Sequence, residues 1–246
     1  NMQSIRSQNA MIFGLFDRQD RLEISIPFTV DNATWHITKQ NNYMPYKAVL
    51  WRAENMGVPK KDITGWVYTN RIQFYDLWKN VKGKRVFVST ENPDIQVQGF
   101  SADKQFFVAL NNLSDTPQKI ELEIAALASS IKDIKVKSLT VYKDDFPRYY
   151  EDVISRIPTV FAIDASETMV IEFNLKNTIP FKNQVKVNRF YSKNYLLPIS
   201  ANQEITFEFN NIELGVGLAT LSMSLGRGHD LSKTPKVFVN GEKVEI

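Results

Sequence analysis

The 246-residue sequence contains no cysteine, only two histidines and no long hydrophobic run. Without cysteine the chain has no disulfide, no thiolate metal site and no cysteine nucleophile. With His36 and His229 alone, a histidine-rich metal site and a relay of several histidines are excluded. No window approaches the ~18 apolar residues that a membrane-spanning helix needs, so we expect no membrane span. We also expect no metal and no other cofactor.

Charge is unevenly distributed along the chain, although the net value is only +3. Residues 1–85 carry 13 Lys and Arg against 7 Asp and Glu, which gives +6. Residues 86–176 carry 9 against 14, giving −5, and residues 177–246 carry 8 against 6, giving +2. The basic first segment favours an anionic partner, with an ordinary solvated surface as the alternative. The sequence lacks the stacking-and-basic repeat of single-strand binders, so we expect no nucleic-acid partner.

The first 85 residues alternate between helical and extended patterns. Apolar residues recur at helical spacing in two stretches, whereas a third stretch alternates apolar and polar residues as a strand does. Trp66 and Trp78 fall on the apolar face of the later helix, and Gly83 just past its end is a stop signal. The predicted elements are a helix at 3–20, a strand at 22–30, a polar aromatic loop at 31–46, a strand at 47–51 and a helix at 63–81.

From Lys84 onward the pattern is strand after strand, separated by Asn- and Asp-rich turns. The predicted strands are 85–91, 94–102, 105–114, 118–126, 134–143, 159–164 and 168–175. Short strands at such spacing predict a β-sandwich. A linker at 177–180 precedes a second, smaller all-β unit, which we also expect to be a sandwich. That unit contains Asn240-Gly241, a strong hairpin signal.

This order of elements predicts an α/β plus all-β protein. Two strands and two helices bury too little surface to form a stable domain, so residues 1–85 read as a fragment of a larger α/β fold. A fragment of this kind that leads directly into sandwiches is typical of the end of a (β/α)₈ TIM barrel followed by accessory domains. We therefore expect a C-terminal barrel portion at 1–85, a β-sandwich at 86–176 and a second, smaller β-sandwich at 177–246.

Four stretches of the sequence resemble glycoside hydrolase family 86, the β-agarases and β-porphyranases of marine and gut Bacteroidetes. They are RSQNAMIFGLFDRQDRLEISIPFTVDNATWH, YKAVLWR, ITGWVYTNRIQFYDLWKNVKGKRVFV and NPDIQVQGFSADKQFFVALNNLSDTPQKIELEI. The resemblance implies a (β/α)₈ barrel followed by two β-sandwich domains. It also implies retaining hydrolysis of β-1,4 linkages in a red-algal galactan, porphyran or agarose, by a bacterial enzyme that is secreted, periplasmic or on the cell surface.

On this resemblance no catalytic residue lies in the sequence. A retaining glycosidase needs two carboxyl groups about 5–5.5 Å apart across the scissile bond. The resemblance implies that both catalytic Glu residues lie upstream of Asn1, in the N-terminal remainder of the barrel, which is therefore an expected partner. Glu23, Asp31 and Glu54 are the acids near the barrel end, and we assign none of them as catalytic.

The loop after the 22–30 strand is where a barrel of this kind would bind substrate, because active sites lie at the C-terminal ends of barrel strands. A sugar presents an apolar C–H face and a rim of hydroxyl groups, which suit flat aromatic rings and short polar side chains. Asn32, Trp35 and His36 meet that need. The alternative is that Trp35 caps the barrel and His36 bonds a backbone carbonyl.

Trp51 and Arg52, at the end of the KAVLW strand, are the other candidate substrate-binding residues. Arg52 has the planar fork that pairs with a sulfate ester or a pair of hydroxyl groups. The alternative pairs Arg52 with Glu54 or Asp62 at the surface.

A rival hypothesis treats the two sandwiches as a non-catalytic carbohydrate-binding module. A second rival hypothesis treats the two sandwiches as structural spacers that brace the barrel. The first rival expects glycan binding by residues 86–246 alone, whereas the second expects support of folding without binding.

Overall fold

The computed structural model describes residues 3–18, 21–124, 128–141, 146–178, 188–213, 215–216, 219–226 and 235–244. The chain divides into two compact units, Asn1–Asn183 and Gln184–Ile246. The predicted linker at 177–180 lies close to this division, with 179–180 outside the described residues. The first unit contains α1 (Gln3–Phe16), β1 (Trp51–Ala53), β2 (Trp66–Tyr68), α2 (Ile72–Trp78), β3 (Lys84–Val86), β4 (Ile95–Ala102), β5 (Gln105–Asn112), β6 (Gln118–Glu121), β7 (Ile131–Val141), β8 (Pro147–Ile154), β9 (Val160–Ile163) and β10 (Glu167–Leu175).

A six-stranded antiparallel sheet in the order β3-β4-β5-β10-β7-β8 is the centre of the first unit. β10 lies between β5 and β7, and every residue of β10 except Asn174 is buried. A strand buried on both faces reads as a continuous apolar run rather than as a clean alternation. The sheet therefore has a protein layer on each side.

One face of this sheet forms the interior of a β-sandwich with the two-stranded sheet β6-β9. Phe106, Ile171 and Phe173 point into this interior, where Ile163 of β9 is fully buried. Alternate residues along each strand point to opposite faces, which explains why these side chains share one cluster. The β-sandwich expected from the sequence is present, and its strands β4, β5, β7 and β10 follow the predicted strand ranges closely.

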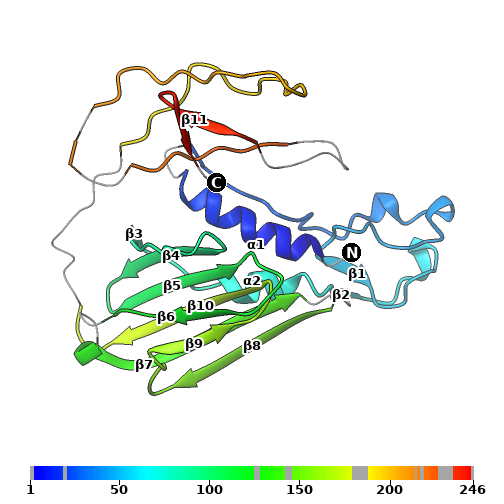
Figure 1. Ribbon diagram of the computed structural model, residues 1–246. Coiled ribbons are helices and arrows are strands. Elements are labelled where there is room, and N and C mark those ends of the chain that lie inside the picture. The colour runs from blue at the N-terminus through cyan, green and yellow to red at the C-terminus, as the bar shows by residue number, and fades with distance from the viewer. Residues whose placement is uncertain are drawn as a thin grey trace. The chain divides into compact units, whose positions relative to one another are not determined.

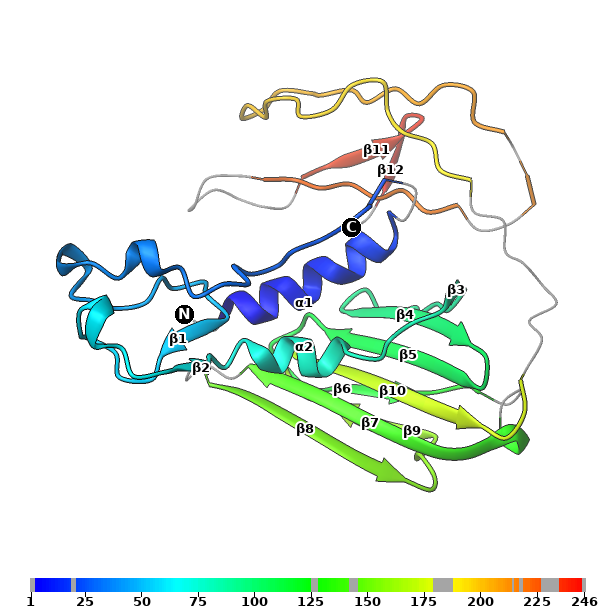
Figure 2. The same cartoon turned by 180° about the vertical axis from the view of Figure 1, so that it is seen from behind.

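The opposite face of the same sheet is covered by α1 and α2, as both views show (Figures 1 and 2). Phe107, Leu139 and Val170 point to this side and join a core that includes Ile5 and Leu77 of the two helices. Each of these five side chains is at most 1% exposed. The α/β segment and the outer face of the six-stranded sheet thus share a hydrophobic core, separate from the sandwich interior, within the unit Asn1–Asn183.

Polar side chains of the sheet also bind α1 directly. The amide of Gln98 donates to the backbone carbonyl of Phe13 at 3.1 Å and to a carboxylate oxygen of Asp17 at 3.1 Å. Arg85 donates to Gln98 Oε1 at 2.7 Å and forms an ion pair with Asp17. Because Gln98 is buried, leaving any of these groups unpaired would carry the cost of desolvation.

A buried lysine of the sheet caps the C-terminal end of α2. Lys137 on β7 is 1% exposed, and its Nζ donates to the carbonyl oxygen of Lys79 at 2.8 Å and to that of Asp76 at 3.4 Å. The last carbonyls of a helix lack intrahelical partners and carry partial negative charge, so a cation suits this position. Burial lowers the pKa of Lys137 from its ordinary value.

Gly83 turns the chain from α2 into β3 and is required there by geometry. Its φ is +104°, and a Cβ at this position would lie 2.2 Å from the backbone oxygen of Ser101. Only glycine combines that backbone conformation with so close an approach. The predicted stop after the helix is therefore present, although α2 itself ends earlier, at Trp78.

The predicted helix at 3–20 is confirmed as α1. The strand predicted at 22–30 is wrong, because this segment forms no strand of a sheet. Within the described residues the segment is extended and makes one isolated parallel bridge, between Thr29 and Val49. Ile24 is 75% and Ile26 is 65% exposed. A strand needs neighbours to form a ladder, and the described chain supplies only that one contact.

The second predicted helix, at 63–81, is only partly correct. Its first part forms β2, which pairs antiparallel with β1, and only Ile72–Trp78 is helical. Trp66 accordingly lies half-buried on a strand, whereas Trp78 lies on the helix face and packs edge-on against Phe13 and Phe16. The strand expected at 47–51 is displaced and begins at Trp51. Cross-strand pairing overrode the helical spacing in both places.

The strand β8 was not expected from the sequence. It forms the edge of the six-stranded sheet, where Arg148, Tyr150, Glu151 and Asp152 are exposed. Edge strands of this kind are polar, and charged side chains on them discourage pairing with other chains. Such a strand therefore lacks the hydrophobic alternation that marks its neighbours.

The second unit contains one hairpin, β11 (Val237–Val239) and β12 (Glu242–Val244), among its described residues. Asn240 and Gly241 form the turn with φ values of +51° and +86°, as the sequence predicted. The other predicted strands of this unit, where described, form no ladder. The second sandwich stays a prediction. No helix in the described ranges is long and apolar enough to cross a membrane.

Replacing Phe107 by Ala should lower the free energy of unfolding of the protein by about 3–5 kcal/mol, the usual cost of removing a buried aromatic side chain. The loss should appear in the tryptophan fluorescence transition, because Trp78 packs against the same core. The control is Lys119→Ala, at an exposed position of β6, which should change the free energy of unfolding by less than about 0.5 kcal/mol. Equal effects of the two substitutions would contradict the shared core.

Glu167 at the start of β10 should make stability depend on pH. Burial raises the pKa of its carboxyl group, although the backbone N–H of Asp164 donates to it at 2.7 Å. The native state therefore holds this proton more tightly than the unfolded chain, and stability is lost as pH rises from the ordinary carboxyl pKa through the raised one. Glu167→Gln keeps an acceptor and removes the titration, so the variant should gain stability relative to wild type between about pH 4 and pH 7. Urea unfolding at both pH values measures this difference, and a constant difference would contradict it.

Candidate functional site

The candidate site is built on the loop that follows the 22–30 segment. Asp31 Oδ1 accepts a hydrogen bond from the backbone N–H of Ala33 at 2.8 Å. Ala33 is fully buried and has a left-handed backbone with φ +44°, from which the short 3₁₀ helix Thr34–His36 begins. Left-handed backbone at a residue with a side chain is a strained conformation that the surroundings must hold in place. The start of the loop therefore has one fixed path.

His36 is tied to the returning strand of the same loop. Its Nδ1 lies 3.2 Å from the carbonyl oxygen of Met44, and the amide of Asn41 donates to the backbone oxygen of His36 at 2.8 Å. A carbonyl oxygen only accepts, so Nδ1 is the donor in this contact, and Nε2 is the ring nitrogen left for another partner. The alternative expected from the sequence, a bond to a backbone carbonyl, is therefore present, and it orients the ring.

Three aromatic rings gather on this loop. Trp35 lies 5.6 Å from His36 and 5.3 Å from Tyr46 between ring centroids, and His36 lies 5.4 Å from Tyr46. Trp35 is 62% exposed, and Tyr46 is 37% exposed. A large exposed aromatic surface is suited to stacking against an apolar ring face.

Beside these rings lies a hollow of about 490 Å³. Its walls carry polar groups and one cation but no carboxylate. They are formed by His36, Asn41, Asn42, Met44, Pro45, Tyr46, Lys47 and Ala48. Asn42 and Tyr43 both have positive φ, +51° and +56°, and this double left-handed turn folds the chain back around the hollow.

The other predicted residues lie on the β1-β2 hairpin. Trp51 pairs in register with Tyr68 across the two strands, with ring centroids 3.8 Å apart. Arg52 donates to the backbone oxygen of Ala53 at 3.0 Å, and the described residues include no ion-pair partner for it, neither Glu54 nor Asp62. Trp51 therefore has an aromatic partner, Tyr68, that was not predicted from the sequence.

The predicted site residues thus fall into two groups. The loop holds half-buried Asn32 together with Trp35 and His36, and the hairpin holds Trp51 and Arg52. Tyr68 could have been found from strand register, because it faces Trp51 directly. The part played by Tyr46 and Lys47 depends on the turn at 42–43, for which the sequence offered only the Asn-rich composition.

The three acids near the expected barrel end lie on different segments of the described chain. Glu23 lies on the extended segment, Asp31 binds the Ala33 N–H, and Glu54 is exposed beside Gly65. Groups of three or more potential metal ligands are absent from the described residues.

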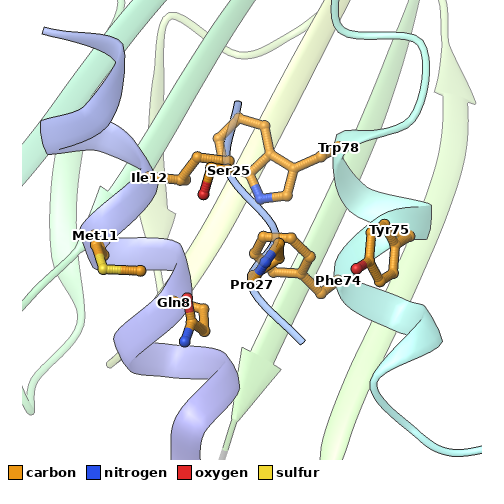
Figure 3. Close-up of a pocket in the computed structure, with 8 residues that line it drawn as sticks. All are labelled: Gln8, Met11, Ile12, Ser25, Pro27, Phe74, Tyr75 and Trp78. Carbon is orange, nitrogen blue, oxygen red and sulfur yellow. The ribbon is translucent and has the colours of Figure 1, made fainter. Parts of the chain in front are cut away.

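A second, smaller cavity of about 210 Å³ lies between α1, the 23–28 segment and α2 (Figure 3). Met11, Ile12 and Trp78 make most of its wall apolar, and Pro27 lies on the segment that runs between the helices. It contains none of the candidate binding residues. Its lining suits packing against hydrophobic side chains more than the binding of a hydroxyl-rich sugar.

Comparison with known proteins identifies the class to which this arrangement belongs. The family profile described as porphyranase beta-sandwich domain 1 matches residues 94–197. A beta-porphyranase A of Phocaeicola plebeius is 39% identical over 246 residues, which is 100% of this chain and 33% of that protein. A funoran endo-beta-hydrolase of Wenyingzhuangia aestuarii is 34% identical over 98% of this chain and 33% of that protein. The chain is thus similar, over nearly its whole length, to about a third of each of two polysaccharide-degrading enzymes.

A solved structure of glycoside hydrolase family 86 is also similar to this chain. The beta-porphyranase of glycoside hydrolase family 86 from the human gut bacterium Bacteroides plebeius superposes with a TM-score of 0.74 at 37% identity, covering 88% of this chain and 38% of that one. The chain is homologous to the enzymes of glycoside hydrolase family 86 and corresponds to their C-terminal part. It spans about a third of the length of the curated relatives it matches.

Trp35→Ala should change the free energy of unfolding by less than about 0.5 kcal/mol, because most of the side chain is exposed. Trp78→Ala is the matched comparison and should cost about 3–5 kcal/mol, since that ring packs on α1 and its indole N–H donates to Asn9 at 2.9 Å. Urea unfolding of both variants measures the contrast. A large loss for Trp35→Ala would show that this ring serves packing.

Proposed function

We propose that this chain is the C-terminal part of a retaining endo-glycoside hydrolase that cleaves β-1,4 linkages in a red-algal galactan. The similarity of the whole chain to a beta-porphyranase carries the proposal. Porphyran is the favoured substrate and agarose the second candidate. The +6 charge of residues 1–85 favours the sulfated polymer over the neutral one.

Both catalytic carboxylates come, on this proposal, from a part of the protein that precedes this segment. We assign no catalytic acid within this chain, and residues 1–85 supply the closing portion of the (β/α)₈ barrel. The extended 23–30 segment supports this assignment, because exposed Ile24 and Ile26 alternate on a stretch without a ladder partner. The remainder of the barrel provides the neighbouring strand that such a segment needs.

The loop 31–48 provides the substrate platform of this segment. Trp35 offers its exposed face to a sugar ring, and His36 and Asn32 bind hydroxyl groups at its edge. Trp51 and Arg52 extend binding along the hairpin, with Tyr68 stacked beneath the indole. The oriented ring of His36 supports this role, because a pre-organised acceptor loses little entropy on binding.

The two sandwiches act as structural supports of the barrel. In the first, at 86–176, helices cover one face of the six-stranded sheet and β6-β9 covers the other. Neither covered face is free to stack against a glycan, which favours a bracing role over a carbohydrate-binding module. We assign residues 177–246 to a second, smaller sandwich.

A polysaccharide substrate cannot enter a cell, so the whole enzyme acts outside the cytoplasm, in the periplasm, at the cell surface or as a secreted protein.

The full-length protein that contains this segment should release reducing ends from both porphyran and agarose, with the higher kcat/KM on porphyran. The 246-residue chain alone should release none, because it lacks the acid pair that the reaction requires. A reducing-sugar assay with both polymers measures this. Failure of the full-length protein on both substrates would refute the proposed function, and turnover by the 246-residue chain would refute the upstream location of the catalytic acids.

A further inference from the structure

The hollow beside Tyr46 has an electrostatic character that the proposed platform does not use. Of the eight residues that line it, Lys47 is charged and positive, and none is acidic. Lys47 is exposed and forms no ion pair with any described residue. An ammonium group without a carboxylate partner in a concave wall raises the local concentration of anions.

The same hollow presents hydrogen-bonding groups of defined direction. The Nδ1 of His36 is used by the carbonyl oxygen of Met44 at 3.2 Å, so Nε2 is the ring nitrogen left for a ligand, and in the neutral imidazole it is an acceptor. The Asn41 amide nitrogen is already used by the His36 carbonyl and by Thr38 Oγ1 at 3.3 Å, which leaves the Asn41 side-chain oxygen as a second acceptor. These two acceptors suit hydroxyl donors and repel a negative substituent.

We propose that this hollow binds a sugar unit that carries an anionic substituent, with Lys47 as the residue that recognises the charge. The ring of the sugar stacks on Tyr46, a hydroxyl group donates to His36 Nε2, and the Lys47 ammonium pairs with a sulfate ester. The inference rests on the proposed function, because it takes the sugar to be part of an algal galactan. Lys47 thereby becomes the specificity-determining residue between sulfated and neutral polymer.

Lys39 provides a matched control on the same loop. It lies in the 3₁₀ helix Lys39–Asn41, is exposed and forms no described ion pair, but it does not line the hollow. Lys39→Met therefore removes the same charge from the same segment without touching the proposed contact. Lys47→Arg keeps the charge and should restore most of the binding lost in Lys47→Met.

The experiment uses the full-length protein and porphyran before and after chemical desulfation, which share one backbone. Affinity electrophoresis measures binding without requiring turnover, and initial rates give kcat and KM. Lys47→Met should weaken binding and raise KM on native porphyran about fivefold, the scale of a partly exposed charge contact, with kcat unchanged. Binding of the desulfated polymer should change less than twofold, and Lys39→Met should change neither.

Four results decide the matter. Equal losses for Lys47→Met and Lys39→Met would overturn the inference, because they would reflect net charge alone. Equal losses on native and desulfated porphyran would also overturn it, because the contact would not involve the sulfate. Wild type that binds both polymers without cleaving them would refute the proposed hydrolysis while leaving the Lys47 comparison decisive. Wild type that binds neither polymer would overturn both.

Discussion

The packing of two helices on the outer face of a β-sandwich sheet is the interaction on which the rest of the first unit depends. Phe107 and Leu139 fill this contact from the sheet side, and Leu77 fills it from α2. Lys137 adds a directional element, because its buried ammonium has its hydrogen-bond partners at the end of α2. A buried cation is costly unless it is paired, so strand β7 and the end of α2 must form together. Hydrophobic burial stabilises this contact, and the lysine fixes its register.

The position of the loop that carries the proposed binding residues follows from that contact. The ring of Phe28 lies edge-on to that of Phe74 on α2, with 5.4 Å between the ring centroids. The guanidinium carbon of Arg71 also lies 5.4 Å from the centroid of the Phe28 ring. The chain is therefore anchored just before the left-handed turn at Ala33, where the loop with Trp35 begins. Binding residues on a mobile loop would pay an ordering cost on each binding event. Here α2 packs on the sheet of the sandwich, and Phe28 packs on α2 just before the loop begins.

Sequence reasoning succeeded where the pattern was local and failed where the deciding contact was distant. The central strands showed themselves by alternation and by turn residues, which are properties of a few neighbouring residues. The strand β2 was mistaken for helix because its partner β1 lies about 15 residues away, and only pairing reveals that Tyr68 faces Trp51. In the site, Trp35 was identified by its residue type in a polar loop. Tyr46 was visible as an aromatic residue of the same loop and Lys47 as a weaker candidate, but that they line one hollow depends on how the chain reverses at 42–43. The capping role of Lys137 was invisible, because a lysine in a strand normally indicates an exposed position.

Native-state hydrogen exchange on the full-length protein tests the central claim most directly. The backbone amides of α1 and α2 should exchange with the same opening free energy and the same denaturant dependence as those of β5 and β10, because one core holds all four. Exchange of the two helices through a separate, lower-energy opening, with the sheet amides still protected, would contradict the account. It would show that the α/β segment rests on the sandwich without depending on it.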